Sequence, residues 1–113
     1  MKVSNMISSK GNSVPSQFVV TDTDNTGITK ETFQSYNSVI VTIMYNNIPD
    51  HTLKQKTYLD INKWDYSKTT GKYRNQFLNE TKKETQAKIA SGEYILSSLN
   101  WNRIPQKGML WTQ

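Results

Sequence analysis

The sequence contains no cysteine, only one histidine and no apolar run long enough to cross a membrane. Without cysteine the chain can form neither disulfides nor thiolate metal sites, which fits a reducing cytoplasm. The longest apolar-leaning stretch, residues 39–45, is far shorter than the ~20 residues that a transmembrane helix needs. No apolar run follows Lys2, so we also expect no secretory signal. These absences predict a cytoplasmic protein that does not contact a membrane.

Residue types that usually carry catalysis are also scarce. The single histidine, His51, stands beside Asp50 near a proline, where a histidine is usually solvated. Glycine-rich phosphate loops and nucleophile elbows are missing. A metal-dependent nuclease would need two or three converging carboxylates, and only Asp60 and Asp65 are candidates. The more ordinary interpretation is one turn aspartate and one aspartate near a helix N-terminus. We therefore expect no catalytic activity, no cofactor and no metal, with the nuclease as a third hypothesis.

The chain is long enough for a single domain with a thin core. It has 113 residues, of which 35% are hydrophobic, and its three Trp, six Tyr and three Phe supply large apolar area. Residues 1–15 are rich in Ser, Asn, Lys and Gly, which predicts an irregular lead-in. Residues 16–100 are expected to form one domain. Residues 101–113 form an aromatic tail that either completes the core or exposes an apolar interface.

Five segments rich in β-branched and aromatic residues are predicted to be strands. These segments cover residues 17–21, 28–36, 39–45, 56–61 and 93–99. A cluster of turn-forming residues at 22–27 makes the first two segments a hairpin. In the second segment, alternation places Phe33 on one face and Gln34 on the other. Periodicity alone also allows a short helix for residues 39–45.

Capping signals predict two consecutive helices. Ser67 is a good N-cap for a helix from Lys68 to Leu78, which Asn79 can end in the left-handed conformation. Thr81 and Glu84 then form a capping box that begins a second helix, Lys82 to Ser91, with Gly92 after it. Together the elements predict an α+β domain, with an antiparallel sheet of three to five strands and the two helices packed on one face.

Residues 54–88 contain nine basic and four acidic residues, a surplus that equals the net charge of +5. Lys68, Lys72 and Asn75 have the spacing of one helical face. Lysine and asparagine on one face suit contacts to phosphates and bases, although a helix also needs a solvated face. The residues that we expect to bind an anionic partner are Lys68, Lys72, Arg74, Asn75, Lys82 and Lys83.

Exposed aromatic side chains in this stretch would add stacking platforms for nucleic acid. Four aromatic residues are instead expected to lie in the core: Trp64, Tyr66, Tyr73 and Phe77.

The motif W-D-Y-S-K-T-T at residues 64–70, followed by Y-R-N-Q-F-L at residues 73–78, resembles a known family. It is similar to small proteins, without an established activity, that bacteriophages and plasmids of low-GC Gram-positive bacteria carry. Three further segments fit the same pattern, at residues 33–36, 58–60 and 91–94, so the resemblance spans roughly residues 12–100. It implies a mobile-element accessory protein in the host cytoplasm, and it assigns no functional residue.

In that context, a small protein without catalytic residues is expected to act by stoichiometric binding. The main hypothesis is an inhibitor, similar to anti-CRISPR proteins, of a host defence protein or nucleoprotein complex. The alternative is a basic regulatory protein that binds nucleic acid directly.

Overall fold

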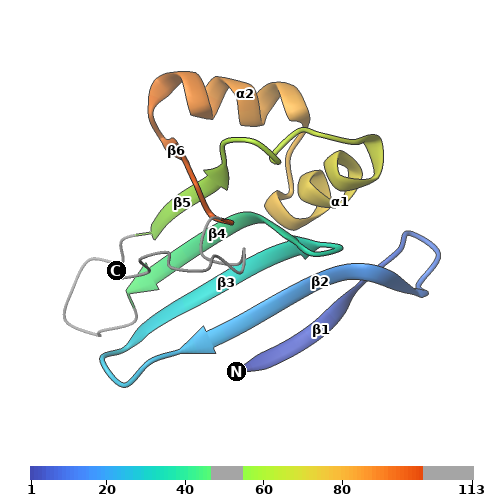
Figure 1. The fold of residues 1–113 in the computed structure, drawn as a ribbon, viewed down its shortest axis with the longest axis horizontal. Helices are drawn as coiled ribbons and strands as arrows, with labels where there is room; N and C mark the ends of the chain where they lie inside the picture. The colour runs from blue at the N-terminus through green and yellow to red at the C-terminus, as the bar shows by residue number, and fades with distance from the viewer. Residues whose placement is uncertain (47–54, 101–113) are drawn as a thin grey trace, which may run out of the picture.

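Six strands in chain order form one sheet, and two consecutive helices lie on one side of it (Figure 1). The computed structural model describes residues 1–46 and 55–100. The strands are β1 (Lys2–Ile7), β2 (Ser13–Thr23), β3 (Ile28–Ser35), β4 (Ser38–Asn46), β5 (Gln55–Asp60) and β6 (Tyr94–Ser97), and the helices are α1 (Lys68–Leu78) and α2 (Lys82–Ser91). The predicted α+β class is confirmed. The loop around His51 and the aromatic tail, residues 101–113, lie outside the described residues.

The predicted strand count of three to five is wrong, because the sheet has six strands. The additional strand, β1, comes from the segment that the sequence indicated as irregular, and β2 also begins in that segment. The two strands pair antiparallel, with Lys2 opposite Thr21 and Ile7 opposite Ser13. Only Met6 is buried in β1, so this edge strand has no apolar alternation by which it could be recognised.

The sheet is also not fully antiparallel. Strands β1 to β5 pair antiparallel, whereas β6 runs parallel to β5, with Thr57 opposite Tyr94. Both helices stand between β5 and β6 in the chain. Such a crossover returns the chain to the end of the sheet where β5 began, so the next strand runs in the same direction.

The predicted hairpin and the buried strand are confirmed. In the turn between β2 and β3, Asp24 Oδ1 accepts hydrogen bonds from the amides of Thr26 (2.9 Å) and Ile28 (3.1 Å). Phe33 is fully buried on the inner face of β3, as its alternation predicts. Residues 39–45 form most of strand β4 rather than a helix.

Both helices begin and end at the predicted residues. Ser67 Oγ accepts from the amide of Thr70 (3.1 Å), and Asn79 ends α1 with φ of 56°. The capping box of Thr81 and Glu84 is present at the start of α2, and Gly92 ends it with φ of 87°. Local sequence therefore determines the bounds of both helices.

The core lies between the sheet and the two helices. The rings of Phe33 on β3 and Phe77 on α1 stack with their centroids 5.8 Å apart, and Tyr73 is buried beside them. From α2, Thr85 is buried and Ile89 packs against the core. The core is thin, so α1 is held to the sheet by a few large side chains.

Candidate functional site

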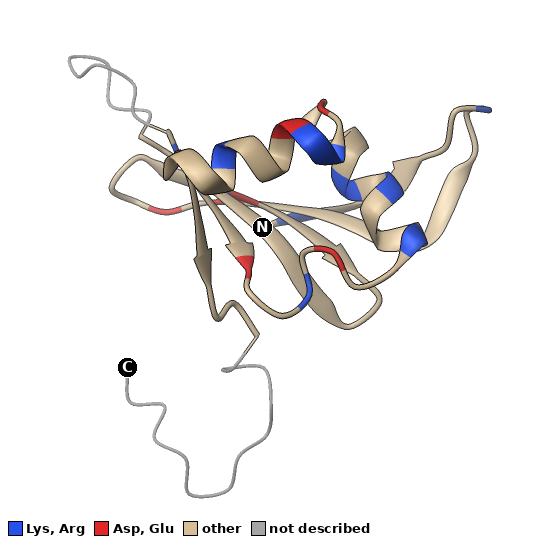
Figure 2. Ribbon diagram, turned by 90° about the horizontal axis from the view of Figure 1, so that it is seen from above, with Lys and Arg blue, Asp and Glu red and all other residues tan. Residues whose placement is uncertain are grey.

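A surface pocket of about 600 Å³ lies where the loop before α1, α1 itself and the first residue of α2 meet. Nine residues line it, and together they are called the basic pocket: Asp65, Tyr66, Ser67, Lys68, Gly71, Lys72, Arg74, Asn75 and Lys82. Four of them are cationic and one is anionic. Figure 2 shows that the lysine and arginine residues of this region gather on α1 and at the start of α2.

Five of the six residues expected to bind an anionic partner line this pocket. Lys68, Lys72 and Asn75 share one face of α1, as their spacing indicates, and both lysines are exposed. Lys72 Nζ lies 5.3 Å from the centroid of the Tyr73 ring, which is a cation–π contact with a core residue. Lys83 is exposed on α2 but does not line the pocket.

Arg74, which we expected to contact an anionic partner, lines the pocket from the buried side of α1. Its side chain is only 1% exposed. Its guanidinium donates to the carbonyl oxygen of Trp64 (2.7 Å) and to Asn75 Oδ1 (2.9 Å), and its Cζ lies 5.2 Å from the Trp64 ring centroid. The signal was present in the sequence. Arg74 follows Thr70 by four residues and precedes Phe77 by three, which places it on the buried stripe of the helix.

Asp65 connects the two helices electrostatically. Its Oδ2 lies 2.7 Å from Lys82 Nζ, and its Oδ1 lies 3.3 Å from Arg74 Nη1. Partial burial raises the pKa of this carboxyl, but the hydrogen bonds from Lys82 and Arg74 outweigh that effect, so the pKa lies below its ordinary value. Asp65 therefore stays ionised and neutralises part of the charge of the pocket. Lys68 and Lys72 are left as the unbalanced cations.

Tyr66 was expected in the core, but its side chain is 43% exposed at the pocket. Lys63 Nζ lies 4.8 Å from the centroid of its ring. An aromatic residue just before an N-cap usually packs on the side chain four positions into the helix. Here that position is Gly71, which has no side chain. Trp64 packs against the core as predicted, so Tyr66 alone of the pair is available to a partner.

The two carboxylates of the nuclease hypothesis serve different parts of the fold. Asp60 is 2% exposed, and it accepts from the amides of Leu99 (2.8 Å) and Asn62 (3.1 Å), so it holds the end of β6 and a tight turn. Asp65 is paired with Lys82 and Arg74. Among residues 1–46 and 55–100, no group of three or more His, Asp or Glu side chains is placed to hold a metal ion.

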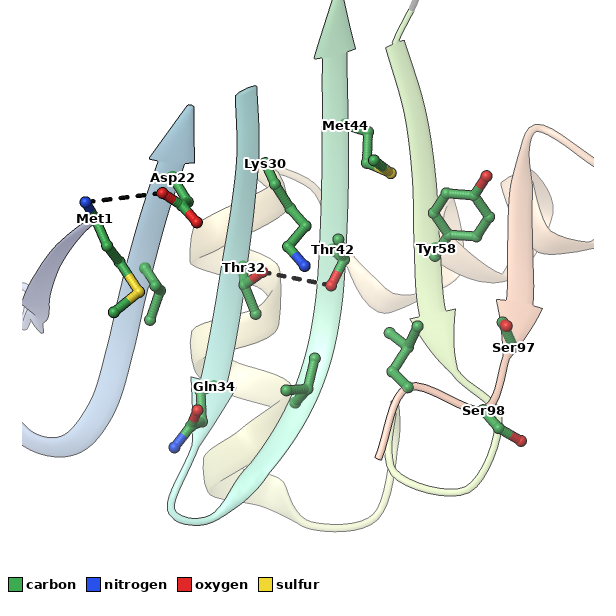
Figure 3. Close-up of a pocket in the computed structure, with 13 residues that line it drawn as sticks. Met1, Asp22, Lys30, Thr32, Gln34, Thr42, Met44, Tyr58, Ser97 and Ser98 are labelled. Carbon is green, nitrogen blue, oxygen red and sulfur yellow. Dashed lines mark hydrogen bonds and ion pairs between the residues drawn. The ribbon is translucent and has the colours of Figure 1, made fainter. Parts of the chain in front are cut away.

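A second cavity, of about 620 Å³, lies on the face of the sheet opposite the helices (Figure 3). Side chains from neighbouring strands form its floor, among them Thr32 and Thr42, whose hydroxyls are 3.5 Å apart. Its charged side chains, Asp22 and Lys30, are opposite in sign. The charges of these two side chains therefore favour neither an anionic nor a cationic ligand. The sequence analysis did not predict this cavity.

The fold and the pocket together define a small α+β protein with a cationic surface pocket at a capped helix pair. The chain belongs to a family of unknown function, DUF8033, whose profile matches residues 1–93. That match includes every strand and helix except β6. No curated protein and no solved structure matches the chain. Within the described residues, none of the helices has the length and apolar character needed to span a bilayer.

Proposed function

We propose that the protein is a non-enzymatic accessory protein of a bacteriophage or another mobile element. It acts by stoichiometric binding to a host defence protein or nucleoprotein complex, and the basic pocket is its contact surface. The observation that supports this proposal is the charge of the pocket, with four cations against one carboxylate. These cations lie on two helices that each have an N-cap bond, so the contact surface is held in place before it meets a partner.

The chemistry of the carboxylates also favours binding over catalysis. Asp60 is occupied by two backbone amides, and Asp65 by two cations. Both have a structural role that explains their positions. A partner with an acidic surface, or one that carries nucleic acid, is the partner that the remaining cations complement.

Direct binding of nucleic acid is the second candidate, and the exposed ring of Tyr66 favours it. A ring beside unbalanced lysines offers both stacking and phosphate contacts. This alternative predicts an affinity that falls steeply with salt, because neutralised phosphates release counterions.

The test is affinity capture from the lysate of a host that carries a defence system, with and without nuclease treatment. The wild-type protein is compared with the double variant Lys68→Glu/Lys72→Glu in the pocket. The control, Lys10→Glu/Lys56→Glu, changes the net charge equally at two exposed lysines outside the pocket.

We expect the wild type and the control to retain one host complex and to raise phage plating on that host, and the pocket variant to do neither. A partner that survives nuclease supports the inhibitor, whereas loss of all partners after nuclease supports direct nucleic-acid binding. Equal behaviour of all three proteins would overturn the assignment of the pocket.

A further inference from the structure

The basic pocket surrounds the N-terminus of α1, where two backbone donors remain open. The amide of Thr70 donates to Ser67 Oγ (3.1 Å), and the amide of Gly71 donates to the Ser67 carbonyl (2.9 Å). The amides of Lys68 and Thr69 have no hydrogen-bond partner in the part of the chain that the structure describes. The first turn of a helix points such amides outward along its axis, where an anion can accept from them.

A buried donor of a residue that lines the same cavity also lacks a partner. Arg74 lines the pocket with a side chain that is 1% exposed, and its buried Nε has no partner among the described residues. Buried N–H groups are nearly always paired. The carbonyl of Trp64 and the side chains of Asp65 and Asn75 occupy the other nitrogens of this guanidinium.

The charges of α1 also oppose its own dipole. The helix begins with Lys68, has Lys72 one turn later and has no acidic residue in its first turn. In α2 the arrangement is the reverse, with Glu84 in the first turn and Lys88 in the last. Cations at a helix N-terminus are unfavourable by themselves and become favourable when an anion sits among them. An anion bound among these cations would relieve the unfavourable charge pattern of α1.

Gly71 supports the same interpretation. Glycine inside a helix is unfavourable relative to alanine. The three atoms nearest to a Cβ built at Gly71 all belong to the Arg74 guanidinium, and the closest is at 3.7 Å, which is an ordinary contact distance. The fold therefore has room for a side chain here. Because Gly71 has no side chain, the wall of the pocket stays open beside Lys68 and Lys72.

We propose that the basic pocket binds a phosphate group. The open amide of Lys68 and the ammonium groups of Lys68 and Lys72 would contact its oxygens. Asn75 adds a donor, because its Oδ1 already accepts from Arg74 and its Nδ2 is left to donate. A phosphate has enough oxygens for this set of donors, whereas a carboxylate has two. This inference rests on the proposed function, since it names the chemical group that the contact surface recognises.

Two sources can supply this group: free phosphate and the backbone of a nucleic acid. Tyr66, exposed at the same pocket, favours the nucleic acid, because its ring can stack on a neighbouring base. The test therefore has two arms, which are inorganic phosphate and a short oligothymidylate.

The experiment follows the backbone amide signals of the whole chain by NMR during each titration. We expect saturable shifts that are largest at the amide of Lys68. Acetate at equal ionic strength should leave these signals unchanged. Gly71→Ala should weaken phosphate binding about tenfold, because its methyl group narrows the pocket, while it raises the thermal midpoint. Lys68→Gln should weaken it similarly, and the exposed control Lys56→Gln should not.

A nucleic-acid source predicts that the oligonucleotide binds more tightly than phosphate and that Tyr66→Ala removes the difference. Equal affinities identify free phosphate as the ligand, with the pocket still assigned. Shifts that do not saturate, that spread over all surface lysines or that acetate reproduces would overturn the inference. If one of these outcomes is found and the Lys68→Glu/Lys72→Glu variant still loses its host complex, the phosphate site is rejected and the proposed function stands.

Discussion

Glu80 shows how one residue can hold several elements together. Its side chain is 4% exposed, and its two oxygens accept from Lys88 Nζ (2.8 Å), Tyr94 Oη (2.9 Å) and Thr85 Oγ1 (2.6 Å). The group joins the end of α1 to α2 and β6. A buried carboxylate is tolerated when all its oxygens are paired, but removal of one partner leaves an uncompensated charge.

This group predicts opposite pH limits for stability. Burial raises the pKa of Glu80, but the bonds from Lys88, Thr85 and Tyr94 outweigh it, and the pKa lies below its ordinary value. Its stabilisation is therefore present above the unfolded pKa of about 4.3 and is lost as the pH falls through the folded pKa. Burial, and then the bond to Glu80, raise the pKa of Tyr94 from 10.0 to about 12. The contribution of Tyr94 is present below pH 10.0 and is lost as the pH rises through about 12.

Urea unfolding at a series of pH values measures both limits. We expect Tyr94→Phe to flatten the alkaline limb and to reduce the acid limb only in part, because Lys88 and Thr85 still donate to Glu80. Glu80→Gln should reduce both limbs. An alkaline limb that is unchanged in Tyr94→Phe would contradict the assignment.

At the scale of elements, the helix caps are local devices whose effect can be measured separately from the core. Ser67 satisfies one amide of α1, and the box of Thr81 and Glu84 satisfies two donors of α2. Asn79 ends α1 in the left-handed conformation, just before the short connection to α2. The path of the chain between the helices, and with it the pocket, depends on these caps.

Ser67→Ala is expected to lower the free energy of unfolding by about 1 kcal/mol, because the amide of Thr70 loses its acceptor. Thr69→Ala is the matched control, since Thr69 is exposed and makes no capping bond. Its change should stay within about 0.5 kcal/mol. Urea denaturation of the two variants checks the difference, and equal losses would indicate that Ser67 does not act through its cap.

At the scale of the molecule, the parallel strand β6 is attached by polar contacts at its end. Asp60 at the end of β5 accepts from the amide of Leu99, and the amide of Ile61 donates to the Ser97 carbonyl (2.9 Å). Next along the chain, Asn100 bonds both the amide (2.7 Å) and the carbonyl (2.9 Å) of Val39 at the start of β4. These contacts hold β6 as the sixth strand at the edge of the sheet, beside the five strands that pair antiparallel.

Asp60→Ala should therefore destabilise the whole fold by about 3 kcal/mol, because the amides of Asn62 and Leu99 both lose their acceptor. Urea unfolding gives the total, and hydrogen exchange at Leu99 locates the loss. Asp22→Ala, at an exposed aspartate of β2, should change the free energy of unfolding by less than about 0.5 kcal/mol. Similar losses for the two variants would mean that Asp60 has no special role in holding β6 to the sheet.

The parts of this fold that sequence alone predicts are those with local causes. Ser67, Thr81, Asn79 and Gly92 mark the helix ends because each acts on amides or dihedral angles within a few residues. The hairpin turn that begins after Thr23 was predictable for the same reason. Strand β1 was not, because an edge strand depends on its neighbour for pairing and needs little apolar alternation.

The site divides in the same way. Helical spacing placed Lys68, Lys72 and Asn75 on one face before any tertiary contact was considered. The burial of Arg74 against Trp64, the exposure of Tyr66 and the ion pair between Asp65 and Lys82 depend on how the loop before α1 and the start of α2 meet. Sequence by itself determined the two helices, the hairpin turn and the sign of the charge, because these follow from neighbouring residues. Only the tertiary structure decided which cations remain available to a partner, because burial and pairing are set by residues distant in the chain.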